Sequence, residues 1–130
     1  MPFEKFIREM KERYEGEVEA GVAIDKVSKE IKKLLEKLAR DLSQEIKYSS
    51  DFEISTFVDD SQYIGEVKIE DQVLDITRLG NEITVKLNDS ELDRITYNGI
   101  FVQDKNKDEF NDLRFREYLR VLYSGSFSNK

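Results

Sequence analysis

The residues that come closest to a catalytic constellation in this sequence are Asp59 and Asp60, followed by Glu66 and Lys68. Carboxylate oxygens bind Mg²⁺, and a bound Mg²⁺ can polarise a phosphate and activate a water molecule. Glu66 and Lys68 are two residues apart, so in a strand both side chains lie on the same face. Together the four residues define a hypothesis of Mg²⁺-dependent phosphoryl transfer.

An Asp, a short gap and a Glu-x-Lys motif resemble the metal-binding segment of restriction-enzyme-like nucleases. In that family two carboxylates hold Mg²⁺ beside the scissile phosphate, and the lysine helps to activate water. The resemblance covers residues 59–68 and implies a crossover helix after the Glu-x-Lys strand. Another strand-like run follows here instead, so the pattern favours an ordinary strand with solvated charges.

The chain contains no histidine and no cysteine. Histidine is the commonest general base and transition-metal ligand, while cysteine supplies thiolate nucleophiles, zinc ligands and disulfides. These absences exclude a Ser-His-Asp triad and a disulfide framework. The sequence also shows no complete calcium loop and no glycine-rich phosphate loop. We therefore expect a non-catalytic protein that needs no metal and no cofactor.

The charge is distributed unevenly along the 130 residues, which include 28 acidic and 21 basic side chains and have a net charge of −7. Residues 48–106 contain 13 acidic and 5 basic residues, a net charge of −8. An acidic surface disfavours nucleic acid and anionic membranes, and it suits a basic protein partner or nucleic-acid mimicry. Solubility and protection of sheet edges explain the same charges without a partner. The acidic residues of this segment are Asp51, Glu53, Asp59, Asp60, Glu66, Glu70, Asp71, Asp75, Glu82, Asp89, Glu91, Asp93 and Asp104.

Two helices are predicted in the first 47 residues. Residues 2–15 have apolar side chains three and four positions apart, which is typical of a short amphipathic helix, and Gly16 and Gly21 should end it. Residues 22–47 have a longer apolar stripe whose heptad spacing lasts only from Ile24 to Leu38. This pattern favours a helix packed on a sheet, with a dimeric coiled coil as the alternative. A basic ridge should face outward from the long helix, formed by Lys26, Lys29, Lys33, Lys37 and Arg40.

Residues 52–103 alternate between apolar and polar side chains in short runs separated by turn residues. Gly80-Asn81 and Asn98-Gly99 are strong hairpin signals. The links are too short for parallel crossovers, so we expect an antiparallel meander of five to six strands. The whole chain, residues 1–130, is then expected to form a single α+β domain.

A C-terminal helix is predicted over residues 107–123, with Asn106 as its cap and a disordered tail over residues 124–130. Apolar side chains cover most of its circumference, so it is either a core helix or a helix partly buried by a partner. Aromatic residues beside arginines are typical of interface hot spots. The predicted partner-binding residues are Phe115, Arg116, Tyr118, Leu119, Arg120 and Tyr123.

These patterns favour a small acidic protein–protein interaction module of the inhibitor, immunity or adaptor type, with an unknown protein partner. Self-association into a homo-oligomer is expected, whereas nucleic-acid binding is disfavoured. No apolar run reaches the roughly 18 residues that span a membrane, and no secretory signal is found at the start. A cytoplasmic protein without membrane contact is therefore expected.

Overall fold

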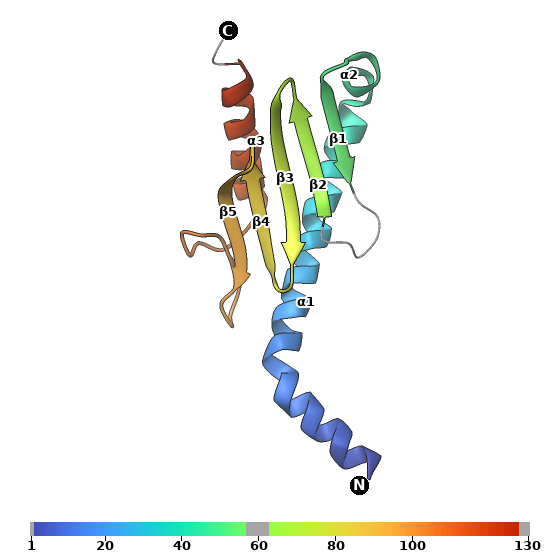
Figure 1. Ribbon diagram of the computed structural model, residues 1–130, viewed down its shortest axis with the longest axis vertical. Helices are drawn as coiled ribbons and strands as arrows, with labels where there is room; N and C mark the ends of the chain where they lie inside the picture. Colours follow the sequence, from blue (N-terminus) through green and yellow to red (C-terminus); the bar gives the residue numbers. More distant parts are fainter. Residues whose placement is uncertain (1, 57–62, 128–130) are drawn as a thin grey trace.

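The computed structural model describes residues 2–56 and 63–127 and shows an α+β fold (Figure 1). A long helix, α1 (Phe3–Asp41), and a short helix, α2 (Ser43–Tyr48), precede a six-stranded antiparallel sheet, and helix α3 (Asp112–Phe127) follows it. The strands occupy the sheet in chain order, which confirms the predicted meander. They are β1 (Phe52–Thr56), β2 (Tyr63–Ile69), β3 (Gln72–Leu79), β4 (Glu82–Leu87), β5 (Ser90–Tyr97) and β6 (Val102–Gln103).

The hairpin turns lie close to where the turn residues predict them. Gly80 has a φ of 61° between β3 and β4, and Asn88 and Asp89 have φ values of 52° and 69° between β4 and β5. Asparagine, aspartate and glycine tolerate this left-handed region better than other residues. The Asn98-Gly99 signal also marks a turn, in which the Asn98 side chain accepts hydrogen bonds from the backbone of Ile100 (2.8 Å) and Phe101 (2.9 Å).

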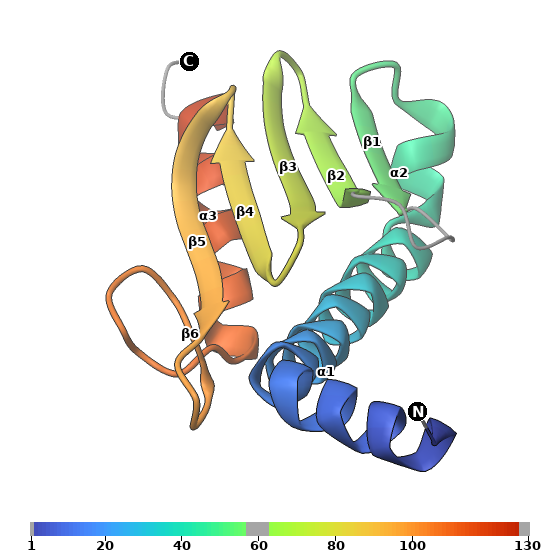
Figure 2. The same ribbon diagram turned by 60° about the horizontal axis from the view of Figure 1, so that its bottom comes forward.

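Both long helices cover the same face of the sheet (Figures 1 and 2). Gly65, Ile76, Val85 and Asp93 form one cross-strand row over β2 to β5, so their side chains point to one face. Leu35 of α1 lies over Gly65, and an α3 tyrosine bonds to Asp93 at the other end of the row. No described helix covers the opposite face, which we call the open face.

The second half of α1 forms one wall of the hydrophobic core. Ile24, Val27, Ile31 and Leu35 are buried against the sheet, and Gly65 makes their close approach possible. A Cβ atom at position 65 would lie 2.4 Å from Leu35 Cδ1. The predicted packing of this helix on a sheet is therefore confirmed.

The expected break at Gly16 and Gly21 is wrong, because α1 runs through both residues and the first interruption is at Leu42. The predicted helices over residues 2–15 and 22–47 are thus one helix followed by α2. An interior glycine costs only about 1 kcal/mol relative to alanine. Oppositely charged residues four positions apart, such as Glu9 and Arg13 or Arg13 and Glu17, support the helix on both sides of Gly16. The helix still bends before it reaches the sheet (Figure 2).

The C-terminal helix is displaced from the predicted range of residues 107–123, since α3 spans Asp112–Phe127. The capping residue is Asn111 rather than Asn106. Its side chain accepts hydrogen bonds from the backbone of Leu113 (3.0 Å) and Arg114 (3.3 Å), which satisfies free amides of the first turn. Part of the predicted disordered tail is helical, because α3 extends through residues 124–127.

Candidate functional site

The structure describes two of the four predicted nuclease residues. Asp59 and Asp60 lie outside the described residues, whereas Glu66 and Lys68 are half-buried on the open face of β2. Strand β2, which contains Glu66, leads through a tight turn at Glu70 and Asp71 directly into β3, so the crossover helix of the nuclease family is not found there. Within the described part of the chain, no group of three potential protein ligands is arranged to hold a metal ion.

The open face mixes both signs of charge. Glu66, Asp75 and Lys86 are neighbours in a row over β2, β3 and β4, and Arg94 of β5 forms ion pairs with Glu91 (2.7 Å) and Glu82. Nucleic-acid mimicry needs a double row of acidic groups, and the described residues of this face do not form one. Asp75 Oδ1 is buried and has no hydrogen-bond partner among the described residues, and burial raises the pKa of its carboxyl.

The basic ridge of α1 faces outward as predicted. Its four lysines and Arg40 are all exposed, and Lys37 pairs with Asp41 at 2.8 Å. Acidic residues of the same helix lie among these cations, so the ridge is a solvated helix face with alternating charge.

Helix α3 divides the predicted partner-binding residues into two groups. Phe115 and Tyr118 are only 2% exposed and belong to the core, and Leu119 packs partly against it. Arg116, Arg120 and Tyr123 are exposed. Arg116 pairs with Asp112 at 3.4 Å, and Arg120 pairs with Glu117 at 3.0 Å. The buried aromatic residues are therefore not available to a partner, because they fill the protein's own core.

Beneath α3 lies a buried polar cluster that the sequence patterns did not indicate. Asp93 and Asp104 are at most 3% exposed, although both were counted among the surface carboxylates. Arg114 Nε lies 3.3 Å from Asp93 Oδ2 and 3.1 Å from Asp104 Oδ2, and the Tyr118 hydroxyl donates to Asp93. Asp93 also accepts a hydrogen bond from the backbone of Lys105 (2.9 Å). The cluster thus joins β5, the loop after β6 and α3.

The electrostatics of this cluster point to a structural role. Burial and the hydrogen bond to Asp93 raise the pKa of the Tyr118 hydroxyl, which stays protonated and donates. Burial acts to lower the pKa of Arg114, but Asp104 and Asp93 raise it above its ordinary value. Buried charges are tolerated when they are paired and hydrogen-bonded in this way. The sequence signal that could have indicated the cluster is the spacing of Arg114 and Tyr118, which are four residues apart on one helix face.

The first half of α1 projects away from the sheet (Figures 1 and 2). We call residues 3–19 the arm. From Pro2 to Glu19 only Met10 is partly buried, and every other residue is exposed. Six large apolar side chains lie within a band about 120° wide on one face of this helix. They form the arm stripe, which consists of Phe3, Phe6, Ile7, Met10, Tyr14 and Val18.

Among the described residues, the sheet contacts the arm only near its base. The Tyr97 hydroxyl donates to the Glu19 carboxylate (2.6 Å), and the Asn81 side chain donates to the Glu17 carbonyl (3.3 Å). Arg78 forms an ion pair with Asp25. Phe3 is 79% exposed, Phe6 50% and Val18 61%. Soluble monomers rarely expose so many neighbouring large apolar side chains, and such patches mark interaction surfaces.

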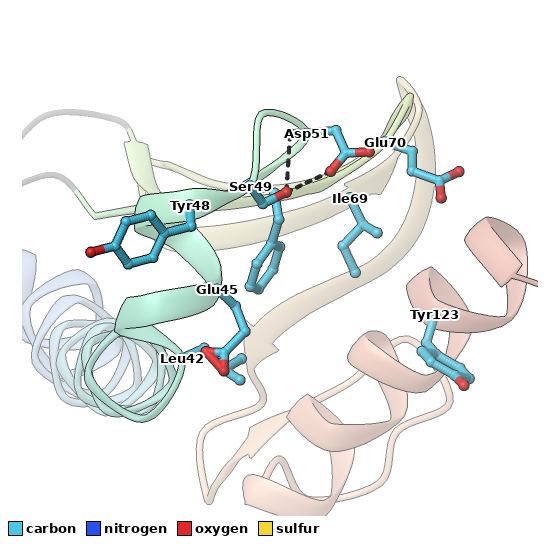
Figure 3. A pocket seen from close by; sticks show the side chains of 9 residues that line it. Leu42, Glu45, Tyr48, Ser49, Asp51, Ile69, Glu70 and Tyr123 are labelled. Atoms are coloured by element: carbon cyan, nitrogen blue, oxygen red, sulfur yellow. Dashed lines mark hydrogen bonds between the residues drawn. The ribbon is translucent and has the colours of Figure 1, made fainter.

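A second apolar surface lies between α2 and α3 (Figure 3). We call it the α2–α3 groove; its volume is about 660 Å³. Phe52 and Ile69 line it from β1 and β2, Leu42 and Tyr48 from the α2 side, and Tyr123 from α3. The remaining lining residues are Glu45, Ser49, Asp51 and Glu70. Three of its lining residues are acidic, and none of those described is basic.

Comparison with known proteins shows no relationship on which a function could rest. No protein-family model matches the chain, and neither the curated proteins nor the solved structures match it significantly. Among the described residues, no helix combines the length and the apolar character needed to cross a bilayer.

Proposed function

We propose that this chain is a non-catalytic protein–protein interaction module whose arm docks onto a macromolecular partner. The arm stripe carries the proposal, because its six large apolar side chains lie on the part of α1 that extends beyond the sheet, and five of them are exposed. An exposed amphipathic helix that offers anchors three and four residues apart matches the helix-in-groove mode of recognition.

The energetic reason lies in the cost of leaving this surface in water. Each large apolar side chain gains roughly 1.5–3 kcal/mol when it is fully buried. Helices of this length are marginal in isolation, so a partner would also stabilise the helical conformation. A docked arm satisfies both requirements, whereas a role in solubility would favour polar residues at the positions of the stripe.

The arm replaces α3 as the leading docking element. Phe115 and Tyr118 contribute to the core, so Arg116, Arg120 and Tyr123 are the members of the predicted set that a partner can reach. The mixed charges of the open face give no comparable apolar anchor. Because the chain lacks cysteine, it suits a reducing compartment, and we place this activity in the cytoplasm.

The proposal is tested with a variant that changes the arm stripe without touching the core. Phe6→Glu combined with Met10→Glu, the arm variant, introduces charges at an exposed and a partly exposed position. The immobilised wild-type chain should capture a partner from a lysate of its source cells, and the arm variant should lose it. With the purified partner, the dissociation constant should rise at least about tenfold.

Ile100→Glu is the matched control, since Ile100 is 84% exposed and lies between β5 and β6, away from the arm. This change has the same chemistry as those in the arm, so it should leave partner capture intact. If the arm variant captured every partner with the same affinity as the wild-type chain, the proposal would be refuted. A second variant with Arg116→Glu and Arg120→Glu tests whether the exposed arginines of α3 contribute.

A further inference from the structure

The charges of the arm are segregated along its length. Its tip, residues 3–13, has four basic and three acidic side chains and a net charge of +1, whereas its base, residues 14–19, has Glu15, Glu17 and Glu19, no basic residue and a net charge of −3. The helix dipole adds to this contrast, because its positive end is at the tip, where no described side chain caps α1. A partner that lies along the arm should show the opposite order of charge.

We infer that this partner is the arm of a second copy, which pairs with it in the antiparallel direction. This inference rests on the proposed function of the arm and names its partner. Antiparallel pairing brings each positive tip against the negative base of the other arm, whereas parallel pairing brings like charges together. Such complementarity fixes the orientation of two partners. The arm is acidic as a whole, but the same helix running in the opposite direction supplies the required order of charge.

The spacing of the arm stripe fixes the register of the pair. Phe3, Ile7, Met10 and Tyr14 are four, three and four residues apart, which is the spacing of a seam between two helices. With Ile7 of one arm opposite Met10 of the other, Phe3 lies opposite Tyr14 and the seam is apolar throughout. Glu17 then lies beyond the seam, beside the uncapped helix N-terminus of the other arm, which attracts carboxylates. A parallel pair would instead place the two copies of Glu17 against each other.

The residues beside the seam support the same register. Glu4 and Lys11 border the stripe on one side and Arg13 borders it on the other, next to Phe6, as the helical period places them. Antiparallel helices bring equivalent sides together, so Glu4 of each arm meets Lys11 of the other and the dimer forms this ion pair twice. Within one arm these two residues are roughly 10 Å apart along the axis. On the opposite side Arg13 meets Phe6, where a cation–π contact is favourable.

The rest of the chain leaves room for this pairing. The register covers residues 3–14, whereas the sheet donates its hydrogen bonds to the arm at Glu17 and Glu19. Figure 2 shows the arm extending away from the sheet, so the two sheets lie at opposite ends of the paired arms. The contact is isologous, and assembly therefore closes at two copies. Because two short helices make a small interface, we expect a dissociation constant in the micromolar range.

The decisive experiment is charge-reversal complementation, measured by analytical ultracentrifugation at low ionic strength. Glu4→Lys alone and Lys11→Glu alone each replace both ion pairs with like charges, so each should raise the dissociation constant of the dimer roughly tenfold. An equimolar mixture of the two variants should form heterodimers with nearly wild-type affinity, since both pairs again have opposite charges. The chain that carries both substitutions should dimerise like wild type for the same reason. In a parallel pair Glu4 and Lys11 do not meet, and neither recovery occurs.

The wild type should be dimeric at roughly 100 µM, and the arm variant should be monomeric. The control Ile100→Glu should dimerise like wild type. A monomeric wild type, a dimer that the arm variant retains, or a mixture without recovered affinity would each overturn the inference. Arm-dependent capture of a different protein would still uphold the proposed function, so the two failures are distinguishable.

Crosslinking gives a second measurement that does not depend on a loss of assembly. Because the chain has no cysteine, Phe3→Cys and Tyr14→Cys each introduce a single thiol. Oxidation of the mixed chains should give a disulfide-linked heterodimer, since the two positions lie opposite each other in the antiparallel pair. Each variant alone should crosslink poorly, because its two thiols are then roughly 16 Å apart along the pair. Efficient crosslinking of each variant alone, with little in the mixture, would show parallel arms and overturn the inference.

Discussion

Helix α3 and the arm are both helical segments with aromatic side chains and arginines, yet their surroundings differ completely. Phe115 and Tyr118 of α3 lie in the core, while Phe3 and Phe6 of the arm remain in solvent. The order of the elements explains this difference. Helix α3 follows β6 and returns across the sheet, whereas the arm precedes the part of α1 that the sheet already covers.

The comparison shows that a hot-spot composition does not by itself identify an interface. Aromatic and arginine side chains also occur in a core that contains buried polar groups, where Arg114 and Tyr118 bind Asp93. The useful distinction is whether the apolar stripe of a helix has another element to pack against. The stripe of α3 has the sheet, and the arm stripe has no described element.

The largest expected difference between the two regions is in folding stability. Phe115→Ala should lower the free energy of unfolding by about 3–5 kcal/mol, because it leaves a cavity in the core. Phe6→Ala in the arm should change it by less than about 0.5 kcal/mol. Urea unfolding followed by circular dichroism measures both. Equal effects of the two substitutions would show that the arm packs on the rest of the chain.

Substitution of Tyr118 tests how much the buried polar cluster beneath α3 contributes to stability. Tyr118→Phe removes the hydroxyl donor of Asp93 and should cost about 1–3 kcal/mol at neutral pH. Tyr14→Phe is the matched change in the arm and should have almost no effect on unfolding. The same urea titrations compare the two, and a silent Tyr118→Phe would exclude the hydrogen bond.

The cost of Tyr118→Phe should also depend on pH. The folded state raises the pKa of Tyr118 above its ordinary value of 10.0, so its stabilising contribution is fully present below pH 10. As the pH rises above 10, the unfolded chain gains stability by ionising this tyrosine. The difference in unfolding free energy between wild type and Tyr118→Phe should therefore shrink in that range, and a constant difference would contradict the assigned shift.

Substitutions of two glycines compare the half of α1 that packs on the sheet with the exposed arm. Gly65→Ala should destabilise the fold by about 1–3 kcal/mol, because the added methyl would lie 2.8 Å from the Ser55 carbonyl oxygen as well as against Leu35. Gly16→Ala meets nothing within 4 Å and should stabilise the arm helix by up to about 1 kcal/mol. Thermal unfolding and helix content by circular dichroism provide the measurement.

The smallest expected effects come from exposed arginines. Arg116→Glu with Arg120→Glu in α3 should leave partner capture and the unfolding midpoint nearly unchanged, since both side chains are exposed and pair within the helix. Lys11→Glu with Arg13→Glu, which changes two residues beside the arm stripe, should weaken partner capture severalfold. Capture from lysate by each immobilised variant compares the two pairs, and a stronger effect of the α3 variant would reverse the assignment.

Much of the architecture could be predicted because it depends on local periodicity. The alternation over residues 52–103 and the turn residues around Gly80 and Asn98 indicated the antiparallel meander. The stripe from Ile24 to Leu38 indicated a helix packed on it. Helix ends were less predictable, since the cap at Asn111 and the continuity through Gly16 depend on small energy differences between competing local structures.

The candidate functional surfaces were harder to predict from the sequence than the fold. Asp93 and Asp104 look like other acids in an acidic segment, and only the fold brings them beside Arg114. The α2–α3 groove joins residues more than 70 positions apart, such as Tyr48 and Tyr123. No local sequence pattern indicates that these two tyrosines line the same groove. The apolar stripe of the arm could be recognised in the sequence. Its exposure to solvent could not, because it depends on where the sheet ends.

The amino-acid sequence was sufficient to predict the α+β class, the order of the elements, the acidic balance and the chemistry that the absence of histidine and cysteine excludes. These properties follow from composition and from periods of two and 3.6 residues, which are local. Which apolar stripe packs against the rest of the chain follows only from the tertiary structure. That outcome depends on the position of each helix relative to a single finite sheet face, which has room for α3 and the second half of α1.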